Sequence, residues 1–308
     1  MKISIIGTGG VGGYFGGKMA RAGFEVSFLA RGKHLEAINQ NGLIVKSILG
    51  DFTVENVHAS DTIANLGESD IIIVAVKAWQ VKEVAGGINS ILKPDTVIIP
   101  LQNGVLAADE LSNWIDKKHI LGGLCRILSM IEAPGVIKHF GIEPVVLFGE
   151  FDKHQSERTL RVKKVFDKSG ISSKIANDIE AEIWKKFINI CVSGLLAITR
   201  TSYGELREIK ETRQMMIDLF KEIYLLSQKK GIQIKPDFVE KTVAFVDTFP
   251  YNSTSSLTRD VWEGKPSEIE YQNGTVVKMA KEYGLEVPVN TFVYHSILPA
   301  ELKARERK

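Results

Sequence analysis

Three glycines near the start of the chain, Gly7, Gly9 and Gly12, have the G-x-G-x-x-G spacing that suits binding of a nucleotide pyrophosphate. We expect Gly7 to make a tight turn, Gly9 to let the backbone approach the pyrophosphate, and Gly12 to let a helix pack closely against a sheet. Backbone N–H groups at the start of that helix, those of Gly10 and Val11 among them, would bind the anion. A glycine-rich turn without a ligand is the alternative.

The residues around this motif predict the elements that position it. Residues 2–6 are a β-branched apolar run typical of a buried strand, residues 14–22 read as a helix that ends at Gly23, and residues 24–30 read as a second strand. Strand, glycine turn, helix and strand in this order form the unit in which such glycines bind dinucleotides.

The end of the second predicted strand carries cations rather than a carboxylate. An enzyme that uses NAD usually has Asp or Glu there for the ribose 2′-hydroxyl, whereas this chain has Arg31 and Lys33. Both side chains suit a 2′-phosphate, so we expect NADP as the cofactor. The alternative for Arg31 is a solvated surface arginine.

Composition limits the class of protein. A chain of 308 residues with 44% hydrophobic and 25% charged residues is typical of a globular protein with two domains. The net charge of +2 and the lack of a basic–aromatic cluster argue against a nucleic-acid partner. No apolar run is long enough for a membrane span or a signal peptide, so we expect a cytoplasmic protein. Cys125 and Cys191 fit no metal-binding spacing; we expect both to be reduced and buried, and we expect no metal.

Two polar residues follow predicted strands of the first half. Lys77 comes directly after an apolar strand at residues 70–76, and Asn103 follows a strand at residues 96–101. Ligands of an open α/β sheet bind at the carboxyl ends of its strands. We therefore interpret Lys77 as a crevice residue rather than a surface cation, whereas Asn103 fits a ligand-binding amide and an Asn-Gly turn equally well.

The first half is predicted to be an α/β, Rossmann-type dinucleotide-binding domain over residues 1–176. Pro94 and Asp95 should form a turn before the strand at 96–101, and antiparallel strands should complete the sheet. The other predicted elements are helices at 34–41, 79–92 and 155–169 and strands at 42–46, 51–55, 119–123, 126–132, 136–140, 144–148 and 172–176.

The second half, residues 177–308, has helical periodicity throughout and is predicted to be an all-α domain. Its first helix, at 182–194, carries Lys186, Asn189 and Ser193 on one polar face, which fits a cleft and a solvent-exposed side equally well. The same helix has an apolar stripe made of Trp184, Phe187, Ile188, Cys191 and Leu195. Further helices are expected at 205–229, 236–247, 257–262 and 268–283, and from a cap at 290–291 to a charged end at 303–308.

Several motifs occur in the order found in one enzyme family. They are residues 7–12, Arg31, 76–80, 101–104, 184–186, 254–256, 268–271 with 273–274, and 284–291. In these motifs, and over nearly its whole length, the chain resembles the ketopantoate reductases (2-dehydropantoate 2-reductases). The resemblance implies NADPH-dependent reduction of the 2-oxo acid ketopantoate to pantoate, on the route to pantothenate and coenzyme A, in a cleft between the two domains.

The resemblance also implies catalytic roles. Lys186 would donate the proton to the ketone, and Glu268 would bind substrate and support catalysis. An ammonium group beside the ketone oxygen would stabilise the developing negative charge as well as supply the proton. Lys185 is the rival donor, but it points about 100° away on the same helix.

The resemblance further implies that Ser256 contacts substrate and that Lys77 and Asn103 lie near the nicotinamide and the substrate. The chain departs from the family at Ile190, Gly194 and Ser253, where asparagines are usual. We hypothesise that Asn189 and Ser193 take over from the missing amides.

Two other functions stay open at this point: an NADP-dependent reductase of a different 2-oxo acid or small ketone, and a dinucleotide-binding sensor without turnover. The sequence does not distinguish a monomer from a homodimer.

Overall fold

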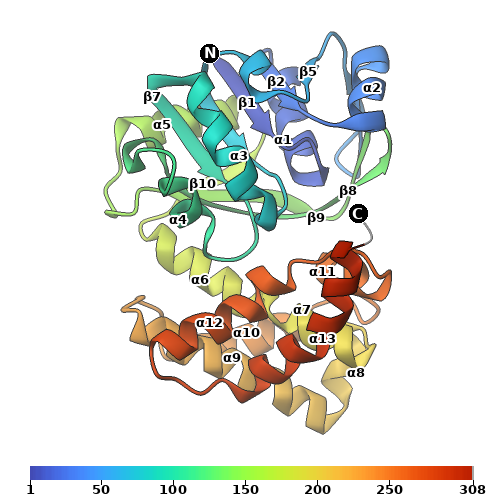
Figure 1. The fold of residues 1–308 in the computed structure, drawn as a ribbon, viewed down its shortest axis with the longest axis vertical. Coiled ribbons are helices and arrows are strands. Elements are labelled where there is room, and N and C mark those ends of the chain that lie inside the picture. Colours follow the sequence, from blue (N-terminus) through green and yellow to red (C-terminus); the bar gives the residue numbers. More distant parts are fainter. Residues whose placement is uncertain (307–308) are drawn as a thin grey trace. The chain divides into compact units, whose positions relative to one another are not determined.

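The computed structural model describes residues 1–306, and the chain forms two compact units. The first unit consists of residues 1–102 and 106–179, and the second consists of Asn103–Val105 and the chain from Glu180 onward. In Figure 1 the first unit contains the strands, coloured from blue to yellow-green, and the second contains the helices coloured from yellow to red. The predicted fold class, an α/β domain followed by a helical one, is confirmed.

A five-stranded sheet with strand order β5-β2-β1-β6-β7 lies at the centre of the first unit, and all of its pairs are parallel. Its strands are β1 (Lys2–Ile6), β2 (Glu25–Leu29), β5 (His58–Ser60), β6 (Ser69–Val74) and β7 (Leu92–Pro100). The central strands are buried on both faces, which explains their continuous apolar sequences.

A second sheet accounts for the remaining strands, so the prediction that antiparallel strands complete the first sheet is wrong. Its strands are β3 (Leu43–Ser47), β4 (Phe52–Val54), β8 (Gly122–Ala133), β9 (Val136–Gly149) and β10 (Ser172–Ile175). One side of β9 pairs with β3 and then with β10, and β8 runs antiparallel to it on the other side.

The four short strands predicted at 119–148 are in fact the two long strands β8 and β9. The pairing of β8 with β9 shifts register near Ile127 and near Glu132, and it continues on both sides of each shift. Gly141, which falls between the predicted strands 136–140 and 144–148, lies inside β9, and a Cβ there would come within 2.6 Å of Leu128 Cδ1.

Helices cover both faces of the parallel sheet. On one face, Ile3, Ile5 and Phe28 pack with α1 and α5 and with the second sheet. On the other face, Ile6 and Ile72 pack with α3 and α4. The helices of this unit are α1 (Gly10–Arg21), α2 (Gly32–Asn41), α3 (Val81–Ile88), α4 (Ala107–Ser112) and α5 (Glu157–Lys168), with 3-10 turns η1 (Ile63–Leu66), η2 (Ala78–Gln80), η3 (Asn89–Ile91) and η4 (Lys117–His119).

The segment from residue 79 to 101 also differs from prediction. The helix expected at 79–92 is the shorter α3 between two 3-10 turns, and β7 begins at Leu92 and continues through Pro94. Pairing with β6 resumes at Val97, so Pro94 and Asp95 lie in an unpaired, exposed bulge. Proline fits there because no backbone N–H is needed for strand pairing.

The helical unit is built around the predicted apolar stripe of its first helix, whose Trp184, Phe187 and Cys191 are buried in one core with Phe220. Its helices are α6 (Ile179–Ile190), α7 (Val192–Thr199), α8 (Tyr203–Glu208), α9 (Lys210–Lys229), α10 (Phe238–Asp247), α11 (Ser256–Trp262), η5 (Ile269–Tyr271), α12 (Asn273–Glu282) and α13 (Pro288–Glu306).

Three predicted helices are interrupted. The helix at 182–194 breaks at Cys191, whose carbonyl accepts a hydrogen bond from Asn273 Nδ2 (3.1 Å). The helix at 205–229 breaks at Ile209, which has extended backbone (ψ 119°), and the helix at 268–283 breaks at Gln272 (ψ −104°). Periodicity could not reveal these breaks, because the apolar pattern continues across each of them.

The last helix starts earlier than predicted. Pro288 occupies its first turn, where proline needs no donor, and Asn290 is inside the helix rather than its cap. The predicted charged end at 303–308 is helical as far as Glu306, and residues 307 and 308 lie outside the described part of the chain.

Both cysteines are free and buried, as predicted. Within residues 1–306 we find no helix with the length and apolarity needed to cross a bilayer.

The close packing at Gly12 predicts a stability difference between two glycines of one motif. A Cβ on Gly12 would come closer than 3.0 Å to the carbonyl oxygen of Gly7, whereas a Cβ on Gly9 would have nothing within 4 Å. We expect Gly12→Ala to lower the free energy of unfolding by about 1–3 kcal/mol and Gly9→Ala by about 0.5 kcal/mol or less. Urea unfolding of both variants measures the difference, and equal losses would contradict the packing role of Gly12.

Candidate active site

The glycine turn connects β1 to α1 at the carboxyl edge of the parallel sheet. Gly7 has φ +105°, a conformation that favours glycine, and a Cβ there would lie 2.7 Å from Val76 N. Thr8 fastens the turn to the end of β2, because its N–H and its hydroxyl both donate to Leu29 O, at 3.0 and 2.8 Å.

This turn fits the pyrophosphate of a dinucleotide. The side of Gly9 that a Cβ would occupy is open space, so an anion can approach the backbone there. The helix that follows has twelve residues, and its first turn carries no acidic side chain to repel a phosphate. Gly10 and Val11 belong to this first turn and supply N–H groups at the positive end of the helix.

His34 supports the glycine turn, a role that no sequence pattern indicates. The N–H of Gly135 donates to His34 Nδ1 (3.0 Å), so the ring carries its proton on Nε2 and donates it to Thr8 O (2.9 Å). Burial lowers the pKa of His34, which keeps the ring neutral and able to accept from Gly135. A histidine one turn beyond Arg31 carries no local signal of this long-range contact.

Arg31 lies where the sequence predicted it, just beyond β2. It is exposed and is the N-cap residue of α2, and Lys33 is exposed in the first turn of the same helix. That first turn carries no acidic residue. The first turn of α2 therefore places no carboxylate beside Arg31 or Lys33. Two cations without a neighbouring carboxylate suit the binding of a phosphate, not of a ribose hydroxyl.

Lys77 follows β6, but not directly, since the strand ends at Val74. The Lys77 side chain is exposed, with Nζ 5.7 Å from the centroid of the Trp79 ring. Gln102 fixes the end of β6, because its buried Nε2 donates to Val74 O (3.0 Å) and to Val76 O (3.1 Å). Gln102, which the sequence analysis did not identify, links the segment after β7 to the end of β6 through its side chain.

Asn103 and Glu268 form the central contact of the helical unit. Asn103 Nδ2 donates to Glu268 Oε2 at 3.0 Å, and Glu268 is only 5% exposed. The neighbouring Gly104 has φ +95°, and a Cβ there would lie 2.7 Å from Tyr271 O, so the chain at 103–105 packs directly on η5. The amide of Asn103 thus contacts a buried carboxylate, and ligand binding by Asn103 stays a prediction.

Lys186 and Asn189 lie one turn apart on α6, and both are half-buried. The Nδ2 of Asn189 is buried and has no hydrogen-bond acceptor among residues 1–306. This donor is therefore available for a hydrogen bond to a bound ligand. The rival Lys185 is engaged on its own helix, with Nζ 2.7 Å from Glu182 Oε1.

The polar face predicted across Lys186, Asn189 and Ser193 is wrong, because the helix breaks between Asn189 and Ser193. Ser193 belongs to α7 and is 2% exposed. Its carbonyl accepts from Thr258 Oγ1 (2.9 Å), and its hydroxyl bonds to Tyr203, whose pKa burial raises to about 12. A substrate contact by Ser193 stays a prediction.

Ser256 is the first residue of α11 and is exposed. The helix is capped by its neighbour Ser255, whose Oγ accepts from the Thr258 N–H (3.1 Å), so the hydroxyl of Ser256 is not needed for capping.

Two of the three positions where asparagines were expected, Ile190 and Gly194, are shaped by core packing here. Ile190 packs against the apolar core of the helical unit. A Cβ on Gly194 would lie 2.6 Å from Asn273 Oδ1 and from Val293 Cγ1, so the glycine makes room for Asn273. An asparagine at position 194 would not fit without a shift of α12 or α13.

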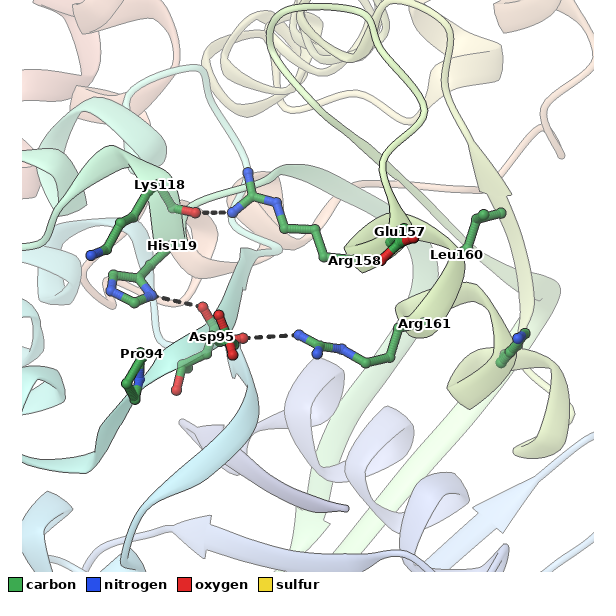
Figure 2. A pocket seen from close by; sticks show the side chains of 10 residues that line it. Pro94, Asp95, Lys118, His119, Glu157, Arg158, Leu160 and Arg161 are labelled. Atoms are coloured by element: carbon green, nitrogen blue, oxygen red, sulfur yellow. Dashed lines mark hydrogen bonds between the residues drawn. The ribbon is translucent and has the colours of Figure 1, made fainter.

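A pocket of about 800 Å³ lies elsewhere in the first unit and contains none of the predicted site residues (Figure 2). It is lined by the residues before the paired part of β7, by η4 and by the start of α5, and its side chains include Lys118, Arg158, Arg161 and Lys164. It therefore lies near the amino end of β7, whereas Gly7, Arg31 and Lys77 follow the carboxyl ends of their strands.

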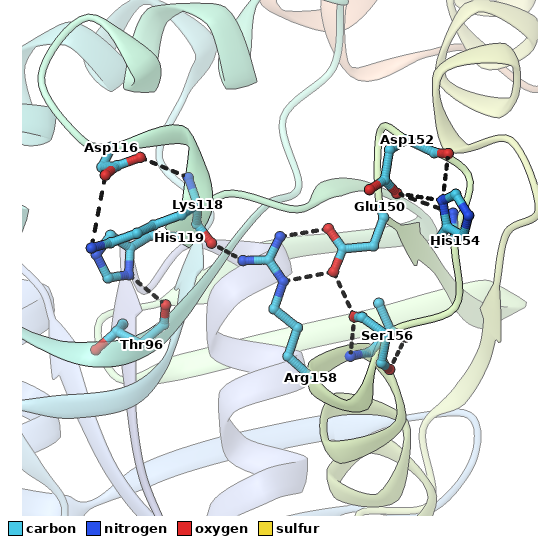
Figure 3. Close-up of polar contacts among 10 residues, drawn as sticks. Thr96, Asp116, Lys118, His119, Glu150, Asp152, His154, Ser156 and Arg158 are labelled. Atoms are coloured by element: carbon cyan, nitrogen blue, oxygen red, sulfur yellow. Dashed lines mark hydrogen bonds and ion pairs between the residues drawn. The ribbon is translucent and has the colours of Figure 1, made fainter.

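Most cations of this pocket already have partners. Arg158 forms a two-point ion pair with Glu150 and donates to the backbone carbonyl of Lys118 (Figure 3). Lys118 Nζ lies 3.8 Å from Asp116 Oδ2, and Arg161 Nη2 donates to Asp95 O at 2.9 Å (Figure 2). These contacts tie α5 to β7 and η4, and we do not take this pocket as the active site.

Among residues 1–306 no group of three or more His, Cys, Asp or Glu side chains is arranged to hold a metal ion. A parallel sheet with a phosphate-binding glycine turn, joined to a helical unit that presents a half-buried lysine and a buried glutamate, is the architecture of a dinucleotide-dependent oxidoreductase.

Comparison with known proteins identifies the family. Residues 3–153 match the model of ketopantoate reductase PanE/ApbA, and residues 178–301 match the model of its C-terminal domain. The chain is 31% identical over 303 residues to a 2-dehydropantoate 2-reductase of Nostoc sp. (96% of this chain, 94% of the relative). It is 30% identical over 302 residues to the uncharacterized oxidoreductase YkpB of Bacillus subtilis (96% and 98%).

A solved structure agrees with these matches. The crystal structure of a PanE/ApbA family ketopantoate reductase from Ralstonia eutropha JMP134 superimposes with a TM-score of 0.91 at 27% identity, covering 99% of this chain and 100% of that one. The chain belongs to the ketopantoate reductase family, and it is an oxidoreductase.

The unpartnered amide of Asn189 leads to a prediction that separates ligand binding from stability. Replacing a buried donor that has no acceptor removes a desolvation penalty. We therefore expect Asn189→Leu to keep or increase the free energy of unfolding. The KM for ketopantoate should rise roughly 10-fold or more, because a hydrogen bond from Asn189 to the charged carboxylate of the substrate would be lost. Urea unfolding and steady-state kinetics measure the two effects.

Asn273→Leu is the matched control, because the Nδ2 of Asn273 has two acceptors, Cys191 O and Asn290 Oδ1. This variant should lose stability. If Asn189→Leu instead lost stability and kept its KM, a ligand-binding role for Asn189 would be ruled out.

Proposed function

We propose that this protein reduces the 2-oxo acid ketopantoate to pantoate with NADPH, a step toward pantothenate and coenzyme A. The observation that carries the proposal is the pair of Asn103 and Glu268: the amide of Asn103, which belongs to the helical unit, donates to a buried carboxylate of the same unit. The family match supports the same reaction class.

NADPH is the proposed cofactor, and when bound it supplies the hydride. The N–H groups at the start of α1 would hold its pyrophosphate beside Gly9, where space is open. Arg31 and Lys33, exposed at the start of α2, would bind its 2′-phosphate. Lys77 and Asn103, which follow β6 and β7, would lie near the nicotinamide.

Lys186 is the proposed proton donor. Hydride addition to the ketone carbon places negative charge on the oxygen, and an ammonium group at hydrogen-bond distance stabilises that charge and then supplies the proton. The half-buried Lys186 on a packed helix suits this task better than Lys185, whose amine is paired with Glu182.

Glu268 would accept a hydrogen bond from a substrate hydroxyl on its buried carboxylate. Asn189 would donate its unpartnered Nδ2 to the substrate carboxylate, and the exposed hydroxyl of Ser256 would contact the substrate. Together these groups would orient the ketone, and orientation alone supplies a large part of the barrier reduction in such reactions.

We also propose that the enzyme acts in the cytoplasm. Its two cysteines are buried and unpaired, which fits a reducing compartment.

The lysine assignment predicts a selective loss of catalysis. We expect Lys186→Ala to lower kcat for ketopantoate by roughly 10²–10⁴-fold, the contribution typical of a positioned proton donor. The NADPH dissociation constant should stay unchanged, because the glycine turn and Arg31 are intact. A spectrophotometric assay of NADPH oxidation and fluorescence titration of NADPH measure the two constants.

Lys185→Ala is the control for this experiment and should retain its kcat. The assignment fails if the two variants exchange these results. A wild-type enzyme that oxidises NADPH faster with other 2-oxo acids than with ketopantoate would change the substrate but not the reaction class.

The cofactor assignment predicts a loss that depends on the 2′-phosphate. We expect Arg31→Ala to raise the KM for NADPH roughly 10-fold or more, because a charge-assisted contact to phosphate is lost. The KM for NADH, which has no 2′-phosphate, should not change. Kinetics with both cofactors test this in one variant, and an equal rise for both would show that Arg31 does not read the phosphate.

A further inference from the structure

We propose that Glu301, on the last helix, is a positioning residue for Glu268 and acts through the backbone of Ser267. The inference rests on the proposed function, in which Glu268 binds the substrate.

Glu301 is a buried carboxylate, 4% exposed, that is fully engaged by the segment before Glu268. Ser267 donates to it twice, from its N–H (2.9 Å to Oε2) and from its hydroxyl (2.6 Å to Oε2). Arg305, one turn further along α13, places Nε 2.7 Å from Glu301 Oε1. The two residues of α13 and Ser267 thus form one closed hydrogen-bonded group.

The same group also holds the other side of Ser267. Arg305 Nη2 donates to Ser267 O at 3.1 Å, and Ser267 is fully buried. Because that carbonyl belongs to the planar peptide that links Ser267 to Glu268, α13 fixes the plane from which Glu268 starts.

Beyond Glu268, the backbone is held by η5. The N–H groups of Tyr271 and Gln272 both donate to Glu268 O at 3.0 Å. With the backbone fixed on both sides, only side-chain rotation is left to Glu268, and the Asn103 amide at 3.0 Å limits that rotation. A substrate-binding carboxylate held in this way is oriented before the substrate arrives.

An ordinary helix-stabilising ion pair does not account for this arrangement. Pairs four residues apart on a helix are usually exposed and contribute a few tenths of a kcal/mol. Here the Glu301 side chain is 3% exposed, and two of its three donors come from outside the helix. Burying a charge costs free energy unless hydrogen bonds and a counter-ion offset that cost, and here the hydrogen bonds come from Ser267 and the counter-ion is Arg305, which also contacts Ser267.

A double-mutant cycle tests the inference. Glu301→Gln is measured in the wild-type background and in a Glu268→Gln background, with kcat/KM for ketopantoate and the NADPH dissociation constant as readouts. If Glu301 acts through Glu268, we expect kcat/KM to fall about tenfold or more in the first background and to change less than about twofold in the second. The fall should lie mainly in KM, and NADPH binding should not change.

Glu150→Gln is the matched control, because Glu150 has the same partners, a serine hydroxyl and an arginine, in the other unit (Figure 3). It should lose thermal stability to a similar extent and keep kcat/KM. Arg305→Lys, which keeps the charge but not the two-point contact, should reproduce the KM rise in a milder form if Glu301→Gln does not fold.

Equal losses of kcat/KM in the two backgrounds would overturn the inference, since Glu301 would then act on the fold in general. The same holds if Glu301→Gln folds and keeps its kinetics, or if it and Arg305→Lys both fail to fold. A wild-type enzyme without turnover on any 2-oxo acid would instead overturn the proposed function, and the inference with it.

Discussion

The burial of one carboxylate is the constraint on which the candidate site depends. Glu268 is removed from water almost completely, and a buried carboxylate needs polar partners to exist there. The chain supplies Asn103 from the end of β7 and holds the Glu268 backbone between η5 and α13. The polar contacts of three distant segments thus converge on a single side chain.

The nucleotide end of the molecule follows a different principle, that of close backbone packing. Gly7 and Gly12 bring the turn and the helix against the sheet, and Gly9 keeps the opposite side open. Thr8 and His34 then fasten the turn to β2 and to the second sheet. An anion would bind here to backbone groups whose positions are set before it arrives.

Two buried amides of the helical unit, Asn273 and Asn189, use their Nδ2 groups differently. Asn273 Nδ2 donates hydrogen bonds to Cys191 O and Asn290 Oδ1 and thereby joins α12 to the break between α6 and α7. Asn189, near that break, has a buried Nδ2 for which residues 1–306 provide no acceptor. Such a group calls for an explanation, and the one proposed here is a hydrogen bond to the bound substrate.

Features that depend on local chemistry could be predicted from the order of residues alone. The G-x-G-x-x-G turn, the parallel strands, the stripe of Trp184 and Phe187, and the cations after β2 all follow from spacing and residue type within a few turns of chain. The fold class could be predicted for the same reason, since alternating strands and helices followed by helices alone are visible in the periodicity.

Strand pairing and the joint burial of polar groups depend on contacts between distant segments, and these contacts exist only in the folded chain. β9 pairs with β3 and β10 as well as with β8 and so builds a second sheet, and no short-range pattern encodes that choice. The breaks at Cys191, Ile209 and Gln272 leave the apolar pattern intact and were therefore invisible to it. The contacts of Asn103 with Glu268, and of Ser267 with Glu301, join residues far apart along the chain, so that only the folded chain could disclose them.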